Sequence, residues 1–456
     1  MTDAAFDVAV IGGGVVGCAV LRGFALAGAR AVLLERDGDL LAGASKGNSG
    51  LLHTGFDAEP GSLEAECVRE GQREYRAIRG RLNLPLLQSG AIVVAWTADE
   101  LAALPAILAR ARENGVPDAA PLSREAVLAR EPHLSPALLG GVWVPDEAII
   151  DPWSAPLAYA MQAIANGAEI RRRAEVRGGR LEGGVWQLDT AAGPVSARVA
   201  VNCAGNYGDL VEAIARNSPF RIRPRKGQFV VFDKTAHRLL SAIVVPVPSA
   251  RTKGVVLART AFGNLLVGPT AEYQEDRSLA TIEQPALERL VAHGRRILPA
   301  LAEHPVTAAF AGLRPATERK DYCIEAVPDR RWISVAGIRS TGLSGALGIA
   351  RHVRALHEVH FGALRDLADP VWPRVPNLAE HAARAYQEAG RSAIVCHCEL
   401  VTQAEIATAL DGPLGAATLG GLRRRTRCML GRCQGFYCSR RIIELADGRL
   451  PGLLAA

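Results

Sequence analysis

The stretch FDVAVIGGGVVG, residues 6–17, decides the fold of this chain. An apolar run with strand character ends at Ile11, and the motif G-x-G-x-x-G follows at Gly12, Gly14 and Gly17. A second apolar run ends at Glu35, twenty-three residues after Gly12. In a βαβ unit these glycines permit a tight turn, a close approach to a pyrophosphate and close helix packing, and the acid accepts hydrogen bonds from a ribose. We therefore predict a dinucleotide-binding α/β domain at the N-terminus.

Length and composition indicate a multidomain globular protein. The chain has 456 residues, of which 49% are hydrophobic and 22% charged, and this length favours two or three domains. The net charge of +6 is weak evidence for a polyanionic partner, and no aromatic residues are interleaved with the basic ones, so we expect no nucleic acid. No apolar run suits an integral membrane segment, and the start lacks signal-peptide features, so we expect a cytoplasmic location.

The segment GASKGNSGLLHTGFDAEPGSLEAE, residues 43–66, follows the second predicted strand. It resembles the D-amino-acid-oxidase-like FAD superfamily, and within it the glycerol-3-phosphate dehydrogenases and oxidases and the L-2-hydroxyglutarate dehydrogenases. Further segments that carry the resemblance are VWVP and IIDP within residues 142–152, VNCAG at 201–205, GLRP at 312–315 and AGIRSTGLS at 336–344. The resemblance spans roughly residues 5–360.

The resemblance implies FAD as the cofactor and adds positions to the dinucleotide motif. The residues expected to bind FAD are Gly12, Gly14, Gly17, Glu35, Ser45, Asn48, Ser49, Ala204, Gly205, Gly337, Gly342 and Leu343.

Oxidation of a secondary alcohol needs a base for the hydroxyl proton and an anchor for the substrate anion. His53 is the candidate base, because a neutral imidazole accepts a proton near physiological pH; the alternative is a histidine that only holds its loop. Arg314 is the candidate anchor, because a guanidinium holds a phosphate or carboxylate by two parallel hydrogen bonds; the alternative is a structural salt bridge. Lys253 and Arg259 are further cations near the predicted substrate mouth.

Cysteines crowd the C-terminal part of the chain. Cys396 and Cys398 stand on one predicted loop, and Cys428, Cys433 and Cys438 stand on another, separated by a helix predicted over residues 403–410. Thiolates select zinc, Cu(I) or iron–sulfur centres. The segment resembles the bacterioferritin-associated-ferredoxin-like [2Fe–2S] module, which implies Cys396, Cys398, Cys433 and Cys438 as ligands.

Two features of this segment bear on that expectation. Cys428 is a thiol that the four-ligand pattern does not require, and it leaves open which four cysteines bind. A zinc site with four cysteine ligands is the alternative. Seven arginines and no acids lie between Arg423 and Arg441, and they would offset the negative charge of a cluster.

The expected fold is α/β plus β: a Rossmann-like FAD-binding domain, an inserted mainly-β substrate domain and a small helical [2Fe–2S] C-terminal domain. Residues 1–80, 150–215 and 330–362 are expected to form the FAD-binding domain, and residues 81–149 and 216–329 the substrate domain. Residues 363–390 form the expected linker, with a helix over 378–389, and residues 391–456 the cluster domain.

The function expected from these features is an FAD-dependent dehydrogenase acting on a small anionic hydroxy compound, foremost glycerol 3-phosphate. Electrons would leave through the cluster to an electron-accepting protein or a quinone-linked subunit, which could hold the cytoplasmic enzyme at the inner membrane. L-2-hydroxyglutarate or another 2-hydroxy acid, and an amino acid or amine, are alternative substrates. A non-catalytic redox sensor or electron-transfer subunit is the alternative of a different class.

Overall fold

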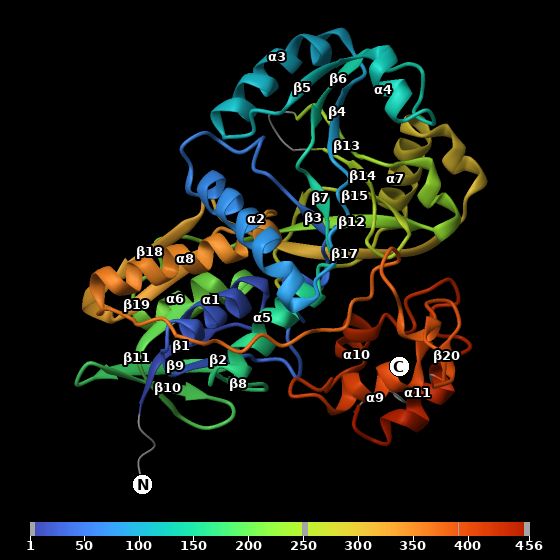
Figure 1. Cartoon of the computed structure of the whole chain (residues 1–456). Coiled ribbons are helices and arrows are strands. Elements are labelled where there is room, and N and C mark those ends of the chain that lie inside the picture. Colours follow the sequence, from blue (N-terminus) through green and yellow to red (C-terminus); the bar gives the residue numbers. More distant parts are fainter. Residues whose placement is uncertain (1–4, 249–253, 391, 451–456) are drawn as a thin grey trace.

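The computed structural model of the chain describes residues 5–248, 254–390 and 392–450. Two large sheets, each with its own helices, and a C-terminal module make up the molecule (Figure 1). Lys253 lies outside the described residues.

The first sheet is built around five parallel strands in the order β19-β11-β1-β2-β8. These are β1 (Phe6–Ile11), β2 (Ala31–Leu34), β8 (Glu169–Arg171), β11 (Val195–Asn202) and β19 (Trp332–Ala336). The antiparallel β18 (Cys323–Val327) extends the edge at β19, and the hairpin β9 (Val176–Glu182) and β10 (Val185–Thr190) pairs with β11.

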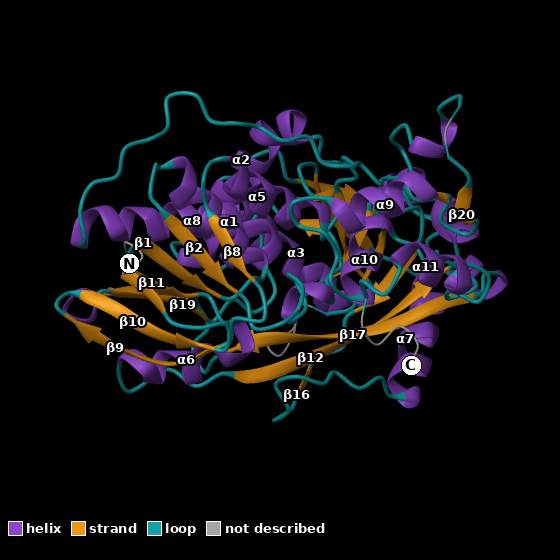
Figure 2. Ribbon diagram, turned by 90° about the horizontal axis from the view of Figure 1, so that it is seen from below, coloured by secondary structure: helices purple, strands orange, loops and turns teal. Residues whose placement is uncertain are grey.

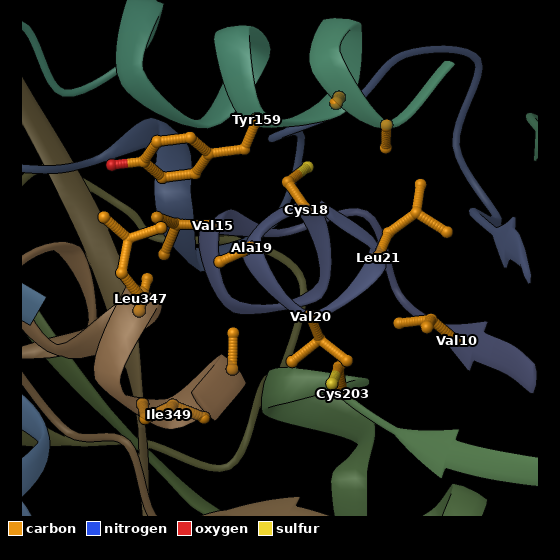
Figure 3. Close-up of a cluster of buried hydrophobic side chains, with 14 of the residues drawn as sticks. Val10, Val15, Cys18, Ala19, Val20, Leu21, Tyr159, Cys203, Leu347 and Ile349 are labelled. Carbon is orange, nitrogen blue, oxygen red and sulfur yellow. The ribbon is translucent and has the colours of Figure 1, made fainter. Parts of the chain in front are cut away.

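Helices cover both faces of this sheet, because β1 is apolar on both sides. Val8 and Val10 belong to one buried cluster, and Ala9 and Ile11 to another on the opposite face. The first face carries α1 (Val15–Leu26), α2 (Leu63–Leu82), α5 (Ser154–Ala165) and α8 (Gly342–His360), and the second carries α6 (Gly208–Ala215) (Figure 2). Figure 3 shows the core around α1.

The second sheet has nine strands in the order β16-β12-β15-β14-β13-β4-β6-β5, with β17 paired to β12. Its strands are β4 (Ala91–Ala95), β5 (Ala120–Ser123), β6 (Gly140–Val144), β12 (Arg223–Phe232), β13 (Ile243–Pro246), β14 (Val256–Arg259), β15 (Leu265–Gly268), β16 (Glu272–Tyr273) and β17 (Val306–Ala316). Its helices are α3 (Ala98–Glu113), α4 (Arg124–Arg130) and α7 (Gln284–Ile297).

Two strand pairs set the geometry between the sheets. The long antiparallel pair β12–β17 runs from the second sheet toward the first, with Arg223 opposite Ala316 at one end (Figure 2). The short antiparallel pair β3 (Leu51–Leu52) and β7 (Ala148–Ile149) joins the segment after the dinucleotide turn to the end of β6. These pairs bring residues from both sheets to one place.

Residues 363–390 cross the surface without the predicted helix. The helix predicted over residues 378–389 is wrong, because only the short 3-10 turn η6 (Ala385–Gln387) forms there. The backbone is held by other partners: Val375 donates its N–H to Leu82 O at 3.1 Å and Glu380 donates its N–H to Ala261 O at 2.8 Å. Tertiary contacts thus override the helix propensity of an alanine-rich segment.

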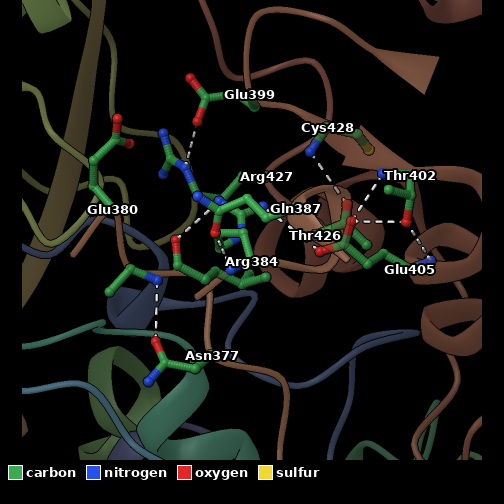
Figure 4. A network of polar contacts seen from close by, with 12 residues as sticks. Asn377, Glu380, Arg384, Gln387, Glu399, Thr402, Glu405, Thr426, Arg427 and Cys428 are labelled. Carbon is green, nitrogen blue, oxygen red and sulfur yellow. Dashed lines mark hydrogen bonds and ion pairs between the residues drawn. The ribbon is translucent and has the colours of Figure 1, made fainter. Parts of the chain in front are cut away.

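The C-terminal module combines a two-stranded sheet, β20 (Ile394–Cys396) and β21 (Val401–Thr402), with α9 (Gln403–Asp411), α10 (Leu419–Thr426) and α11 (Ser439–Ala446). Thr402 and Glu405 form a capping box at the start of α9, which confirms the helix predicted from residue 403 (Figure 4). Its small core includes Ile406, Leu422 and Ile442. In the described residues, no helix has the length and apolarity needed to cross a membrane.

Candidate active site

A cavity of about 800 Å³ lies where the carboxyl ends of the parallel strands meet the second sheet. The residues that follow β1, β2, β11 and β19 line one side, and the β12–β17 pair lines the other through Gly227 and Arg314. Ligands bind at this position in open α/β sheets.

The glycine turn after β1 leaves no room for side chains. Gly12 has φ +108°, and a Cβ there would lie 2.6 Å from Cys203 O. A Cβ on Gly17 would lie 1.9 Å from Gly12 O, so α1 packs against the turn only with glycine at this position. The start of α1 therefore faces the cavity with backbone N–H groups and the positive end of the helix dipole, as a pyrophosphate requires.

Glu35 lies at the end of β2 and is buried. Its carboxylate accepts hydrogen bonds from Gly13 N–H at 2.6 Å and Asp37 N–H at 2.8 Å. Burial raises its pKa, and the two backbone donors oppose that rise. Ser45 Oγ accepts a hydrogen bond from Val15 N–H at 2.9 Å, so the serine-rich segment is tied to the start of α1.

Most of the residues predicted to bind FAD line this one cavity. They are Gly12, Gly14, Glu35, Ser45, Asn48, Ser49, Ala204, Gly205, Gly337, Gly342 and Leu343. Gly17 lies behind the turn, and His53 is not part of the lining. The start of α8, at Gly342, presents a second helix N-terminus to the cavity.

Arg314 on β17 also lines the cavity, and its guanidinium is buried among backbone carbonyls. Its Nη2 donates to Thr270 O at 2.6 Å and Lys226 O at 3.0 Å, and its Nε donates to Arg225 O at 3.3 Å. Burial, together with the nearby charge of Arg225, lowers its pKa to about 10, which leaves the group cationic at neutral pH. The side chain is rigidly placed, and Nη1 takes no part in these three bonds.

His53 lies directly after β3, between the start of α8 and β7. Its N–H donates to Ser344 Oγ at 2.8 Å, and Ser344 follows the cavity residue Leu343. Its Nδ1 lies 2.9 Å from Glu147 Oε2, and the histidine side chain is 27% exposed against 1% for Glu147. This imidazole–carboxylate pair was not predicted from the sequence. Its only signal there is the acid beside the IIDP segment, and that signal does not reveal the partner.

The cysteines predicted as ligands come together in two pairs. Burial raises the pKa of Cys398, and the adjoining Cys433 thiol contributes to the rise. Burial also raises the pKa of Cys438 to about 12, with Cys396 as its thiol neighbour. Cys428 is buried beside Cys396 and Cys438. Within the described residues, no three His, Cys, Asp or Glu side chains group around a point suited to a single metal ion.

The cysteine module contacts both sheets. Arg432 binds the Asp233 carboxylate through two hydrogen bonds of 2.7 and 2.9 Å, and Arg425 binds Asp39 at 2.7 Å. The guanidinium of Arg427 lies 3.7 Å from the ring centroid of Phe262 and donates to Glu399 at 2.8 Å (Figure 4). Arginines that the sequence grouped with the cysteines thus form the contact between the module and the rest of the chain.

This fold and cavity define a class of flavoprotein, and comparison with known proteins identifies it. The chain belongs to the FAD dependent oxidoreductase family, whose profile matches residues 7–356. The protein is therefore an FAD-dependent oxidoreductase.

Individual relatives are more specific. A glycerol 3-phosphate dehydrogenase of Caloramator mitchellensis is 33% identical over 455 residues, covering 96% of this chain and 93% of that protein. A glycerol 3-phosphate oxidase of Mycoplasma pneumoniae is 30% identical, but covers 77% of this chain and 94% of the oxidase.

The fold comparison agrees. The dithionite-reduced L-α-glycerophosphate oxidase of Mycoplasma pneumoniae with FAD bound superposes with a TM-score of 0.76 at 27% identity, covering 82% of this chain and 99% of that one. The match to an anaerobic glycerol-3-phosphate dehydrogenase protein of Escherichia coli K12 is 28% identical and covers 96% of this chain and 87% of that protein.

Proposed function

We propose that this protein is an FAD-dependent dehydrogenase that oxidises glycerol 3-phosphate. The observation that carries the proposal is that a single cavity is lined by the dinucleotide turn on one side and by the buried cation Arg314 on the other. The relatives named as acting on glycerol 3-phosphate support the choice of substrate.

The residues present fit FAD. The start of α1 suits the pyrophosphate, Glu35 the ribose hydroxyls, and the start of α8 the electron-rich edge of the flavin ring. The absence of space for a Cβ at Gly12 and Gly17 keeps the backbone close to the ligand. When bound, FAD supplies an acceptor for the two electrons and the hydrogen of the substrate carbon. Residues 1–80, 150–215 and 330–362 would hold it, and residues 81–149 and 216–329 would hold the substrate.

Arg314 anchors the substrate phosphate in this proposal. Its three bonds to backbone carbonyls fix the plane of the guanidinium before substrate arrives, so little conformational entropy is lost on binding. A buried cation also gives the phosphate a stronger electrostatic attraction than a solvated one.

His53 takes the proton of the substrate hydroxyl. The imidazole lies beside the start of α8, next to the cavity wall at Leu343, so a modest extension of the cavity reaches it. Removal of this proton raises the electron density on the substrate oxygen and promotes transfer of hydrogen from the carbon.

The C-terminal module, residues 391–456, would hold a [2Fe–2S] cluster through Cys396, Cys398, Cys433 and Cys438. Two pairs of thiols suit two irons, each with two protein ligands, better than they suit one zinc ion. The buried arginines around α10 offset the charge of such a cluster. Such a cluster supplies one-electron transfer, and the acceptor would be an electron-accepting protein or a quinone-linked subunit that brings the cytoplasmic enzyme to the membrane.

The relatives supply a second line of support for this module. The dehydrogenase from Caloramator matches nearly the whole chain, whereas the Mycoplasma oxidase, matched over nearly its own full length, leaves part of this chain unmatched. An oxidase passes electrons to oxygen and needs no additional electron exit, so the extra segment favours a dehydrogenase.

A substrate panel with an artificial electron acceptor tests the proposal. Turnover with glycerol 3-phosphate, and much less with L-2-hydroxyglutarate, amino acids and amines, is the expected result. Preference for L-2-hydroxyglutarate or an amino acid would reassign the substrate. Lack of turnover with every compound by protein that retains FAD would favour a redox sensor or electron-transfer subunit.

A further inference from the structure

We propose that Glu147 is a positioning residue that holds His53 with its proton on Nδ1, so that Nε2 is the nitrogen that accepts the substrate proton. The inference rests on the proposed function, because it deepens the role given there to His53.

The β3–β7 pair brings the two residues together. In its antiparallel register Leu51 lies opposite Ile149 and Leu52 opposite Ala148, so the next position places His53 opposite Glu147. Directly opposed side chains in an antiparallel pair lie close enough to interact. The backbone therefore fixes this contact across 94 residues of sequence, and it does not depend on a mobile loop.

The other contacts of Glu147 use its remaining acceptor capacity. Its Oε1 accepts the Thr54 N–H at 2.6 Å and the Thr54 hydroxyl at 2.8 Å, and Thr54 Oγ1 in turn accepts Phe56 N–H at 3.2 Å. The Thr54 hydroxyl proton is thereby directed to Glu147. The carboxylate is 1% exposed, and the three donors offset its loss of solvation.

The tautomer of His53 follows from this arrangement. A carboxylate has acceptors only, so the 2.9 Å contact requires Nδ1 of His53 to carry the hydrogen. A neutral imidazole with a protonated Nδ1 has its lone pair on Nε2. As proton transfer makes the ring cationic, the adjacent negative charge of Glu147 stabilises it.

His53 is also held from its backbone. Its N–H donates to Ser344 Oγ, which donates to Leu51 O at 3.2 Å. Ser344 lies in the first turn of α8, whose first residues line the cavity. The imidazole is thus fixed between β7 and the helix end at the cavity, which suits a base that must meet substrate at one angle.

A double-mutant cycle tests whether Glu147 acts through His53. The rate constant of flavin reduction by glycerol 3-phosphate is measured for wild type, E147Q, H53A and E147Q/H53A. E147Q is expected to lower it by roughly 10²-fold with KM little changed, and to have almost no further effect in the H53A background. Equal losses in both backgrounds, or an effect on KM alone, would overturn the proposal.

E131Q is the matched control for loss of a buried carboxylate. Glu131 is 3% exposed and accepts N–H groups of Ser241 and Ala242, away from His53. E131Q is expected to lower the melting temperature without a comparable loss in the reduction rate. Thermal melts and FAD content of all variants check that each one is folded.

Nitrogen-15 NMR of histidine-labelled protein with FAD bound gives a readout that does not depend on the substrate. The resonance that disappears in H53A identifies His53 and is expected to show protonated Nδ1, with the tautomers mixing in E147Q. Protonated Nε2 with bare Nδ1 in the wild type would overturn the inference, whatever the substrate proves to be. If the tautomer is as expected but glycerol 3-phosphate does not reduce the flavin, the proposed function fails and the positioning role stands.

Discussion

Nδ1 of His53 lies 2.9 Å from Oε2 of Glu147, although 94 residues separate them in the chain. The contact joins the segment after the dinucleotide turn to the strand that returns from the second sheet. A base and the group that orients it are thus supplied by the two sides of one short strand pair, which is the arrangement expected of an active-site imidazole.

Replacement of His53 by alanine should slow flavin reduction by roughly 10²–10⁴-fold without loss of FAD, because the hydroxyl proton then has no fixed acceptor. Anaerobic stopped-flow absorbance measures the rate, and the flavin-to-protein ratio provides the control. An unchanged rate would remove His53 as the base.

Replacement of Arg314 by lysine should raise KM for glycerol 3-phosphate by about 10- to 100-fold, because lysine keeps the charge but loses the planar fork of donors. The three carbonyls that Arg314 now satisfies would also lose partners, so a lower melting temperature is expected. Inorganic phosphate as a competitive ligand gives a second measure of the anion site. An unchanged KM and an unchanged phosphate affinity would show that the phosphate binds elsewhere.

The turn after β1 predicts a sharp contrast between two glycines. G17A should lose FAD and destabilise the fold by about 1–3 kcal/mol, because its Cβ would lie 1.9 Å from Gly12 O. G80A, in α2, meets no atom within 4 Å and should keep FAD with equal or greater stability. Flavin content and thermal melts of the purified variants decide between them. Retention of FAD by G17A would show that this turn does not position the cofactor.

The cysteine pairs predict a selective effect of single substitutions. C396S and C438S should each lose bound iron and the electron paramagnetic resonance signal of the reduced protein, whereas C428S should keep both. Metal analysis of protein purified without oxygen provides the count. Stoichiometric zinc with no such signal would identify a structural zinc site in place of the cluster.

The contact between Asp233 and Arg432 should respond to acid. Its hydrogen bonds to Arg432 hold the pKa of Asp233 at about 2, below the ordinary value of 3.8. Because the folded-state pKa is lowered, the contact stabilises the fold above the ordinary pKa, and this stabilisation is lost as the pH falls from 3.8 toward 2.

D233N should therefore lower stability at neutral pH by about 1 kcal/mol or less, since Arg432 is well exposed. Urea melts followed across the acid range measure this difference. A difference between variant and wild type that does not diminish in acid would contradict the pairing.

The sequence predicted the parts of the site that depend on local order. The G-x-G-x-x-G turn, Glu35 at the end of β2 and the helix from residue 403 all follow from short-range patterns of spacing and capping. Arg314 was singled out by resemblance to a family, and the structure places it on the cavity wall.

Features that depend on pairing distant segments could not be predicted. Glu147 reads in sequence as one acid among many, because only the β3–β7 register reveals its contact with His53. The helix expected over residues 378–389 fails for the same reason, since Ala261 binds the backbone of Glu380 and Lys234 binds its carboxylate at 2.9 Å. Local propensity has no information on such partners.

The most direct test of the account is a single-turnover experiment with protein that carries FAD and the iron–sulfur cluster. The protein is mixed with glycerol 3-phosphate without oxygen, and the visible absorbance is followed in a stopped-flow instrument. The account predicts rapid bleaching of the flavin band and slower loss of the iron–sulfur absorbance. A flavin band that stays unchanged with glycerol 3-phosphate, yet bleaches with L-2-hydroxyglutarate or an amino acid, would contradict it.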